Sequence, residues 1–137
     1  FEKDMWKSQF PKIEIDRGFK SIDKSISLSK LSIYTYNSTG YLESFAANVP
    51  TLLFWSNKKN PLNPEANIFF RELKKVKIFH ESKESLSSHV NGVWDDVDLW
   101  WFSDEVQDIR KKFCEKYAKI NQNKVNEIKS LLLNTKI

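Results

Sequence analysis

One short segment of the chain combines the residue types that bind phosphate groups. The turn Asn37-Ser38-Thr39-Gly40 follows a strand-like run at 31–36 and precedes apolar residues at helical spacing. The first backbone N–H groups of a helix are unpaired and lie at its positive end, so they stabilise an anion. The hydroxyls of Ser38 and Thr39 add donors, and Gly40 allows a close approach to the backbone. The segment predicts a diphosphate site, with Asn37 beside it.

Glu43 follows one helical turn after this segment. From there its carboxylate can accept hydrogen bonds from the two hydroxyls of a ribose. A Ser-Thr pair before a helix is also the ordinary chemistry of a structural cap. The residues alone therefore leave two interpretations open, nucleotide binding and helix capping.

Two further residues fall at the ends of predicted strands. Trp55 ends the apolar run 51–55, and His80 ends the run 77–80. Ligands of an open parallel sheet bind outside the carboxyl ends of its strands. Trp55 can stack on a nucleobase there or belong to the core. His80 can contact base, sugar or phosphate, or lie in a surface turn.

Other reactive residue types do not form a convincing site. Asp96 and Asp98 match an Asp-x-Asp metal pattern, but they lie in a helical, Trp-rich segment where residues two apart point in different directions. Capping and solvation explain them. The chain has two histidines and one cysteine, too few for a metal site built on those residue types. Ser38 has no nearby histidine that would activate it as a nucleophile. We expect no metal and no hydrolase activity.

The elements that must position these residues alternate along the chain. Strand patterns fall at 13–16, 31–36, 51–55 and 77–80, and helical patterns fall at 21–28, 39–47, 64–76, 82–94 and from Ser103. Asn48 suits the left-handed residue that closes a helix, and Pro64 suits a helix start. This alternation predicts an α/β Rossmann-like parallel sheet flanked by helices. We expect one domain over 1–120 and an amphipathic helix over 121–137.

Composition restricts the class of protein. The chain has 137 residues, 40% of them hydrophobic and 29% charged, with a net charge of +4. These values fit one globular domain, and the C-terminal lysines fit the solvated faces of helices better than a nucleic-acid site. No run approaches the roughly 20 apolar residues of a membrane span. We expect a cytoplasmic domain cut from a longer protein, with peripheral contact to an anionic membrane as an alternative.

The first segment also resembles a known site. Residues 36–51, with a small-residue turn, a helix carrying Glu43, then Pro50 and a strand, resemble the donor segment of GT-B-fold glycosyltransferases. In that fold the turn contacts the donor phosphates and the Glu contacts the ribose. The resemblance implies the C-terminal domain of a GT-B architecture, here with extra C-terminal helices.

A second resemblance covers nearly the whole chain. It rests on 51–55, on Glu72 to Ser82, on Val93 to Asp98 with Trp100-Trp101, and on Ser103 to Cys114. With these stretches the chain resembles a bacterial family of O-antigen and surface-polysaccharide transferases. The Trp-rich spacing makes the likeness specific.

These resemblances imply a glycosyltransferase that acts in O-antigen (lipopolysaccharide) or other surface-polysaccharide synthesis. Its donor substrate is a nucleotide sugar, it needs no cofactor, and a saccharide or lipid-linked acceptor binds a second, N-terminal domain. The expected donor contacts are Asn37, Ser38, Thr39, Gly40, Glu43, Trp55 and His80. The catalytic base is not assigned. The alternative is a non-catalytic α/β interaction module, which predicts no nucleotide binding and an exposed apolar patch around the tryptophans.

Overall fold

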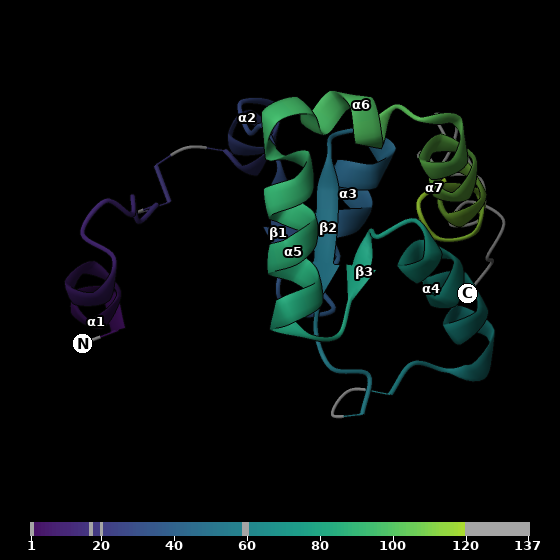
Figure 1. Ribbon diagram of the computed structural model, residues 1–137, viewed down its shortest axis with the longest axis horizontal. Coiled ribbons are helices and arrows are strands. Elements are labelled where there is room, and N and C mark those ends of the chain that lie inside the picture. The colour runs from purple at the N-terminus through teal and green to yellow at the C-terminus, as the bar shows by residue number, and fades with distance from the viewer. Residues whose placement is uncertain (1, 17, 20, 59–60, 120–137) are drawn as a thin grey trace, which may run out of the picture.

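A three-stranded parallel sheet forms the centre of the molecule. The computed structural model describes residues 2–16, 18–19, 21–58 and 61–119 (Figure 1). Strands β1 (Ser32–Tyr34), β2 (Thr51–Phe54) and β3 (Phe79–His80) lie in the order β1-β2-β3. Ile33 pairs with Leu52, and Leu53 pairs with Phe79. The predicted α/β class, a parallel sheet flanked by helices, is confirmed.

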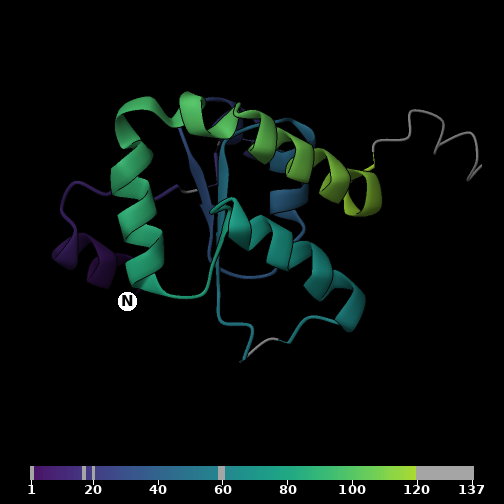
Figure 2. The same ribbon diagram turned by 45° about the vertical axis from the view of Figure 1, so that its right-hand side comes forward.

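Helices cover both faces of this sheet. The helices of the described residues are α1 (Glu2–Gln9), α2 (Ile22–Ser27), α3 (Gly40–Ala46), α4 (Pro64–Lys75), α5 (Lys83–Val93), the 3₁₀ turn η1 (Trp94–Asp96), α6 (Val97–Trp101) and α7 (Asp104–Tyr117). Figure 2 shows α5 on one face and α3, α4 and α7 on the other. Helix α6 passes over the end of the sheet and joins the two layers. Helix α1 lies apart from the sheet (Figure 1).

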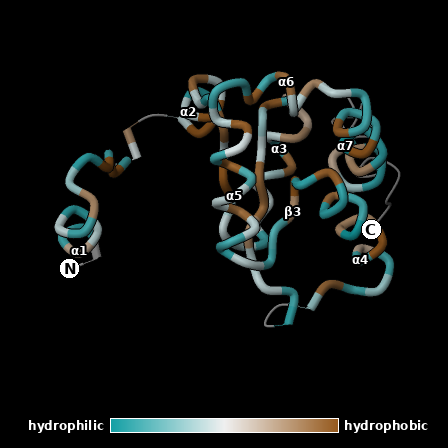
Figure 3. Tube along the Cα trace, viewed as in Figure 1, coloured by the Kyte–Doolittle hydropathy of each residue, from teal (hydrophilic) through white to brown (hydrophobic). Residues whose placement is uncertain are grey.

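The core is largely aromatic and lies between the sheet and the layer of α3, α4 and α7. Phe45, Phe70 and Phe113 come from these three helices and are almost fully buried. The ring of Phe113 meets those of Phe45 and Phe70 edge to face, at centroid distances of 5.4 and 5.6 Å. Leu53 and Phe79, on the facing strands, complete the cluster. Apolar residues accordingly gather along the strands and the inner helices in Figure 3.

The helix boundaries follow local chemistry. Asn63 caps α4 by accepting from Ala66 N at 2.7 Å, with Pro64 in the first turn. Ser82 caps α5 by accepting from Ser85 N at 3.2 Å. Asn48, directly after α3, adopts the left-handed conformation with φ 55°, as its residue type predicted.

Some predicted elements differ from the structure. The strand expected at 13–16 is wrong, because these residues pair with no strand among the described residues. Alternation of apolar and polar residues indicates a strand only where a partner edge is available. β1 and β3 are shorter than the runs 31–36 and 77–80. The helix predicted at 121–137 lies outside the described residues.

Candidate functional site

The candidate site lies where the strands end. Because the three strands are parallel, the segments that follow them meet at one edge of the sheet. The described residues of these segments are 35–39 before α3, 55–58 and 61–63 before α4, and 81–82 before α5. They bring residues from distant parts of the sequence to a common edge.

The turn between β1 and α3 carries most of the predicted contacts. Ser38 N donates to Tyr36 O at 2.9 Å, which closes the turn. Thr39 occupies the N-cap position of α3, but its side chain makes no capping hydrogen bond. Asn37 accepts at Oδ1 from the Tyr41 hydroxyl at 3.1 Å. The prediction that Ser38 and Thr39 offer their hydroxyls to a ligand therefore fits this geometry and stays a prediction.

Gly40 has a packing reason of its own. A Cβ atom at this position would lie 3.0 Å from Cε1 of Tyr34. The Tyr34 ring is held in place by a 2.7 Å hydrogen bond between its hydroxyl and Ser44 Oγ. The absence of a side chain at Gly40 is thus explained by the close approach of Tyr34, with or without a ligand. Glu43, on the same helix, is exposed to solvent.

The loop between β2 and α4 is organised by Asn57, which the sequence analysis did not single out. Its Oδ1 accepts from Leu62 N at 3.0 Å, and its Nδ2 lies 3.3 Å from Asn67 Oδ1. Its backbone N–H donates to Glu81 Oε1 at 3.3 Å, which links this loop to the segment after β3. The sequence signal that could have identified this role of Asn57 is an Asn in a loop that also contains prolines.

Glu81 is held by a neighbouring lysine. Its carboxylate lies 2.6 Å from Lys74 Nζ. The hydrogen bond from Lys74 lowers the pKa of Glu81, and the Asn57 backbone N–H adds a smaller effect in the same direction. Glu81 is therefore ionised at neutral pH and serves to fix the loop.

A hollow opens between these loops and the end of α7, and we call it the edge hollow. It has a volume of about 260 Å³. Its lining consists of Asn37, Tyr41, Leu42, Pro61, Leu62, Asn63, Ala66, Phe70, Phe113 and Tyr117. Among the described residues, no Lys, Arg, Asp, Glu or His side chain lines it. The edge hollow is therefore apolar and aromatic, with a few neutral polar groups.

Two of the residues that line the edge hollow are tyrosines, Tyr41 and Tyr117. Burial raises the pKa of Tyr41 to about 12, with a further contribution from Tyr117, so Tyr41 stays a neutral donor at physiological pH. The Tyr117 hydroxyl is buried and has no hydrogen-bond partner within the described part of the chain. A buried hydroxyl without a partner is costly unless a ligand or water satisfies it.

Trp55 and His80 lie at strand ends but inside the protein. The Trp55 side chain packs against Phe70 and Phe79, with ring centroids 5.6 and 5.1 Å away, and the residue is 5% exposed. His80 is 1% exposed, its Nδ1 lies 2.8 Å from Ser85 Oγ, and its Nε2 lies 2.8 Å from Lys77 O. Both ring nitrogens of His80 are thus engaged within the protein. The proposed donor contacts therefore do not include these two buried side chains.

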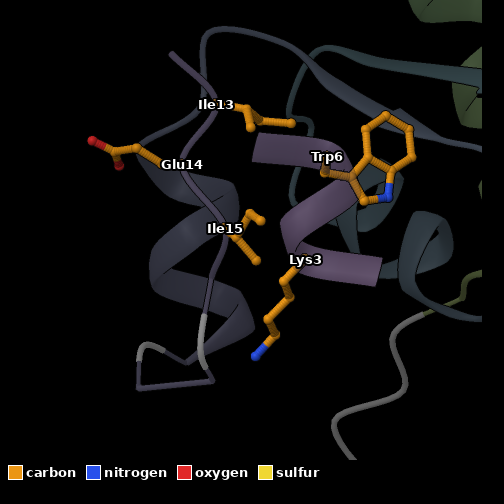
Figure 4. A pocket seen from close by; sticks show the side chains of 5 residues that line it. All are labelled: Lys3, Trp6, Ile13, Glu14 and Ile15. Atoms are coloured by element: carbon orange, nitrogen blue, oxygen red, sulfur yellow. The ribbon is translucent and has the colours of Figure 1, made fainter. Parts of the chain in front are cut away.

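A larger hollow, of about 410 Å³, lies on the N-terminal arm (Figure 4). It is lined by Lys3, Trp6, Ile13, Glu14 and Ile15. The Glu14 carboxylate points away from Trp6 in this view. The arm hollow is formed by one helix turn and one extended segment, and it gathers no set of polar groups that converge on a ligand.

One of the aspartates that follow α5 caps a helix. Asp96 Oδ1 accepts from Leu99 N at 3.1 Å at the start of α6, which confirms the predicted capping role. Within the described ranges, no three His, Cys, Asp or Glu residues lie together as a metal site would require. Across the same ranges, every helix falls short of the length and apolar character needed to span a bilayer.

Comparison with known proteins identifies a family. No curated protein and no solved structure matches the chain. The model of the LIC12162 family transferases matches residues 1–132. This match covers nearly all of the sequence, including the whole sheet and every segment that surrounds the edge hollow. The chain therefore belongs to the LIC12162 family of transferases.

Proposed function

We propose that this chain is the donor-binding domain of a GT-B-type glycosyltransferase and holds a nucleotide sugar at the carboxyl edge of its sheet. One observation carries the proposal: Asn37 of the turn and the loop 61–63 line the edge hollow together with Tyr117, whose buried hydroxyl lacks a partner among the described residues. Membership of a transferase family supports it. The position at the ends of parallel strands is typical of nucleotide sites.

Different residues of the turn and of α3 contact different parts of the donor in this proposal. In this proposal the diphosphate lies against Ser38 and Thr39, whose hydroxyls and neighbouring backbone N–H groups stabilise negative charge. Glu43 is exposed one turn further along α3 and accepts from the ribose hydroxyls. Asn37 belongs both to the turn and to the edge hollow, so it connects the two parts of the site.

The reaction is a displacement at the anomeric carbon of the donor sugar. A bond forms between an acceptor oxygen and that carbon, and the bond between the carbon and the phosphate oxygen breaks. This domain stabilises the charge that the leaving nucleotide gains. The base that takes the acceptor proton is not assigned to this chain, and the acceptor binds a further domain. The resemblance to surface-polysaccharide transferases supports a saccharide or lipid-linked acceptor on the cytoplasmic side of the membrane.

Calorimetric titration of the chain with nucleotides and nucleotide sugars tests this function. The variants are Ser38→Ala and Glu43→Ala, and the matched controls are Ser88→Ala on α5 and Glu105→Ala at the start of α7. Saturable binding that the first pair weakens and the second pair leaves unchanged supports the proposal. Binding that all four variants leave unchanged would place the site elsewhere.

A second function has one observation in its favour. Trp94, Leu99 and Phe102, all within nine residues, are 51%, 76% and 52% exposed. Exposed apolar side chains close together in the sequence fit a non-catalytic interaction module. Trp100 and Trp101 do not join them, because Trp101 is fully buried and Trp100 Nε1 donates to Val76 O at 3.1 Å. If no nucleotide binds in the titration above, the interaction module becomes the better interpretation.

A further inference from the structure

The lining of the edge hollow decides which part of a nucleotide sugar can enter it. None of the described residues that line it carries a charged side chain. A phosphate placed inside would lose its hydration without gaining a cation, which is strongly unfavourable. An uncharged part of the donor therefore fits the hollow, and the charged part fits the turn outside it.

The walls favour a flat, partly apolar group. Phe70, Phe113, Tyr41 and Tyr117 contribute aromatic rings, and Leu42 and Leu62 contribute aliphatic surface. Binding sites for heteroaromatic rings combine such walls with a few convergent polar groups. Within a nucleotide sugar, the base matches this description, whereas the sugar and the ribose are rich in hydroxyls.

The polar groups that line the hollow are mostly donors. Asn63 uses its Oδ1 to cap α4 at 2.7 Å from Ala66 N, which leaves its Nδ2 available. Asn37 uses its Oδ1 to accept from the Tyr41 hydroxyl at 3.1 Å, which leaves its Nδ2 available. The Tyr117 hydroxyl has no partner among the described residues and can donate. The Tyr41 oxygen, which has given its proton to Asn37, remains an acceptor.

We propose that the edge hollow receives the base of the donor nucleotide and selects a pyrimidinedione, the ring class of uracil and thymine. Such a ring presents two carbonyl oxygens, which suit the donors of Asn37, Asn63 and Tyr117, and one ring N–H, which suits the Tyr41 oxygen. Adenine presents no carbonyl oxygen and adds an amino donor. This inference rests on the proposed function and adds the identity of the base.

The test compares UDP with ADP in calorimetric titrations of the full chain. We expect UDP to bind about tenfold more tightly, since adenine lacks the carbonyl oxygens that would accept from Asn37, Asn63 and Tyr117. Tyr117→Phe removes only the unpartnered hydroxyl and should weaken UDP about fivefold while changing ADP little. Tyr36→Phe is the matched control, because Tyr36 is 65% exposed and does not line the hollow.

A second variant fills the hollow. Ala66 lines it and is 9% exposed, so Ala66→Leu should abolish UDP binding. Ile68→Leu on the same helix is its control, because Ile68 is 54% exposed. Circular dichroism shows whether both variants fold. If Ala66→Leu does not fold, Tyr117→Phe still provides an independent test.

The outcomes separate the two proposals. If UDP and ADP bind equally, or if Tyr117→Phe leaves their affinity ratio unchanged, the base assignment is overturned and nucleotide binding stands. If neither nucleotide binds the folded chain, both proposals fail. A UDP preference that Tyr117→Phe reduces and Tyr36→Phe preserves supports the assignment.

Discussion

The hydroxyl of Tyr41 donates a hydrogen bond to Oδ1 of Asn37, with 3.1 Å between the two oxygens. Tyr41 belongs to α3 and is 6% exposed, whereas Asn37 lies in the exposed turn after β1. The bond therefore ties the predicted ligand-binding turn to the hydrophobic core. It also fixes which atoms of Asn37 are left to face a ligand.

Removing this bond should loosen the turn without dismantling the core. Tyr41→Phe keeps the ring contacts with Phe45 and Trp55 and deletes only the hydroxyl. We expect the free energy of unfolding to fall by about 1 kcal/mol, the usual net value of one hydrogen bond. Urea unfolding measures it, with Tyr36→Phe as the control. An unchanged stability would show that the bond does not hold the turn.

The two helical glycines should respond in opposite ways to alanine. Gly40→Ala places a Cβ 3.0 Å from the Tyr34 ring, which Ser44 holds, and should cost about 1 kcal/mol through overpacking. Gly92→Ala on α5 meets no atom within 4 Å and should stabilise the protein by about 0.5 kcal/mol. Thermal unfolding compares them. If Gly40→Ala stabilised the protein, the Tyr34 ring would have moved away from the added Cβ, and close packing would not explain the glycine.

Asn48 should prove important for stability although it lies outside the candidate site. Its Oδ1 accepts from Trp101 Nε1 at 3.0 Å and from Gln107 Nε2 at 3.1 Å, and its φ is 55°. Asn48→Ala loses these bonds and is strained, so we expect a loss of about 2 kcal/mol. Asn48→Gly also loses these bonds, but glycine adopts the left-handed conformation without strain. We expect its free energy of unfolding to fall by only about 1 kcal/mol. Urea unfolding measures both variants. Equal losses in the free energy of unfolding would contradict a contribution from the left-handed conformation.

Acid should destabilise the contact between β3 and α5. Burial lowers the pKa of His89 to about 4, and nearby His80 and Lys77 add to the effect. The His89 ring lies between those of His80 and Trp100, with centroids 5.5 and 4.6 Å away. Burial also lowers the pKa of His80.

The sign of this pH dependence follows from the direction of the shift. Above the ordinary histidine pKa of 6.5, His89 is neutral in both the folded and the unfolded chain, and its contribution to stability is fully present. Between pH 6.5 and about 4 the unfolded chain binds a proton that the folded chain does not, so stability falls. Melting temperatures measured between pH 6.5 and about 4 test this fall in stability. His89→Gln should flatten the profile, and an equally steep profile in that variant would assign the loss to other groups.

Local features of the sequence predicted the elements well. The start of α4 at Pro64, the left-handed Asn48 and the buried strand β2 all depend on neighbouring residues, so the sequence pattern identifies them. The strand predicted at 13–16 was wrong because strand formation depends on a partner that no local pattern reveals.

The edge hollow was not foreseen, because its residues are far apart in the sequence. Tyr117 comes from the end of α7, while Asn37 and Asn63 come from turns more than fifty residues earlier. No sequence pattern could show that the Tyr117 hydroxyl would lack a partner among the described residues. The turn 37–40, by contrast, could be predicted because it depends on strand, turn and helix signals within ten residues.

The most direct test of the donor-site account is to map where a nucleotide contacts the chain, by following backbone amide shifts in ¹H–¹⁵N spectra as UDP is added. The account predicts saturable shifts concentrated at 37–43, at 61–66 and near Tyr117. Shifts concentrated instead around 94–102, or no shifts at millimolar UDP in the folded protein, would contradict it.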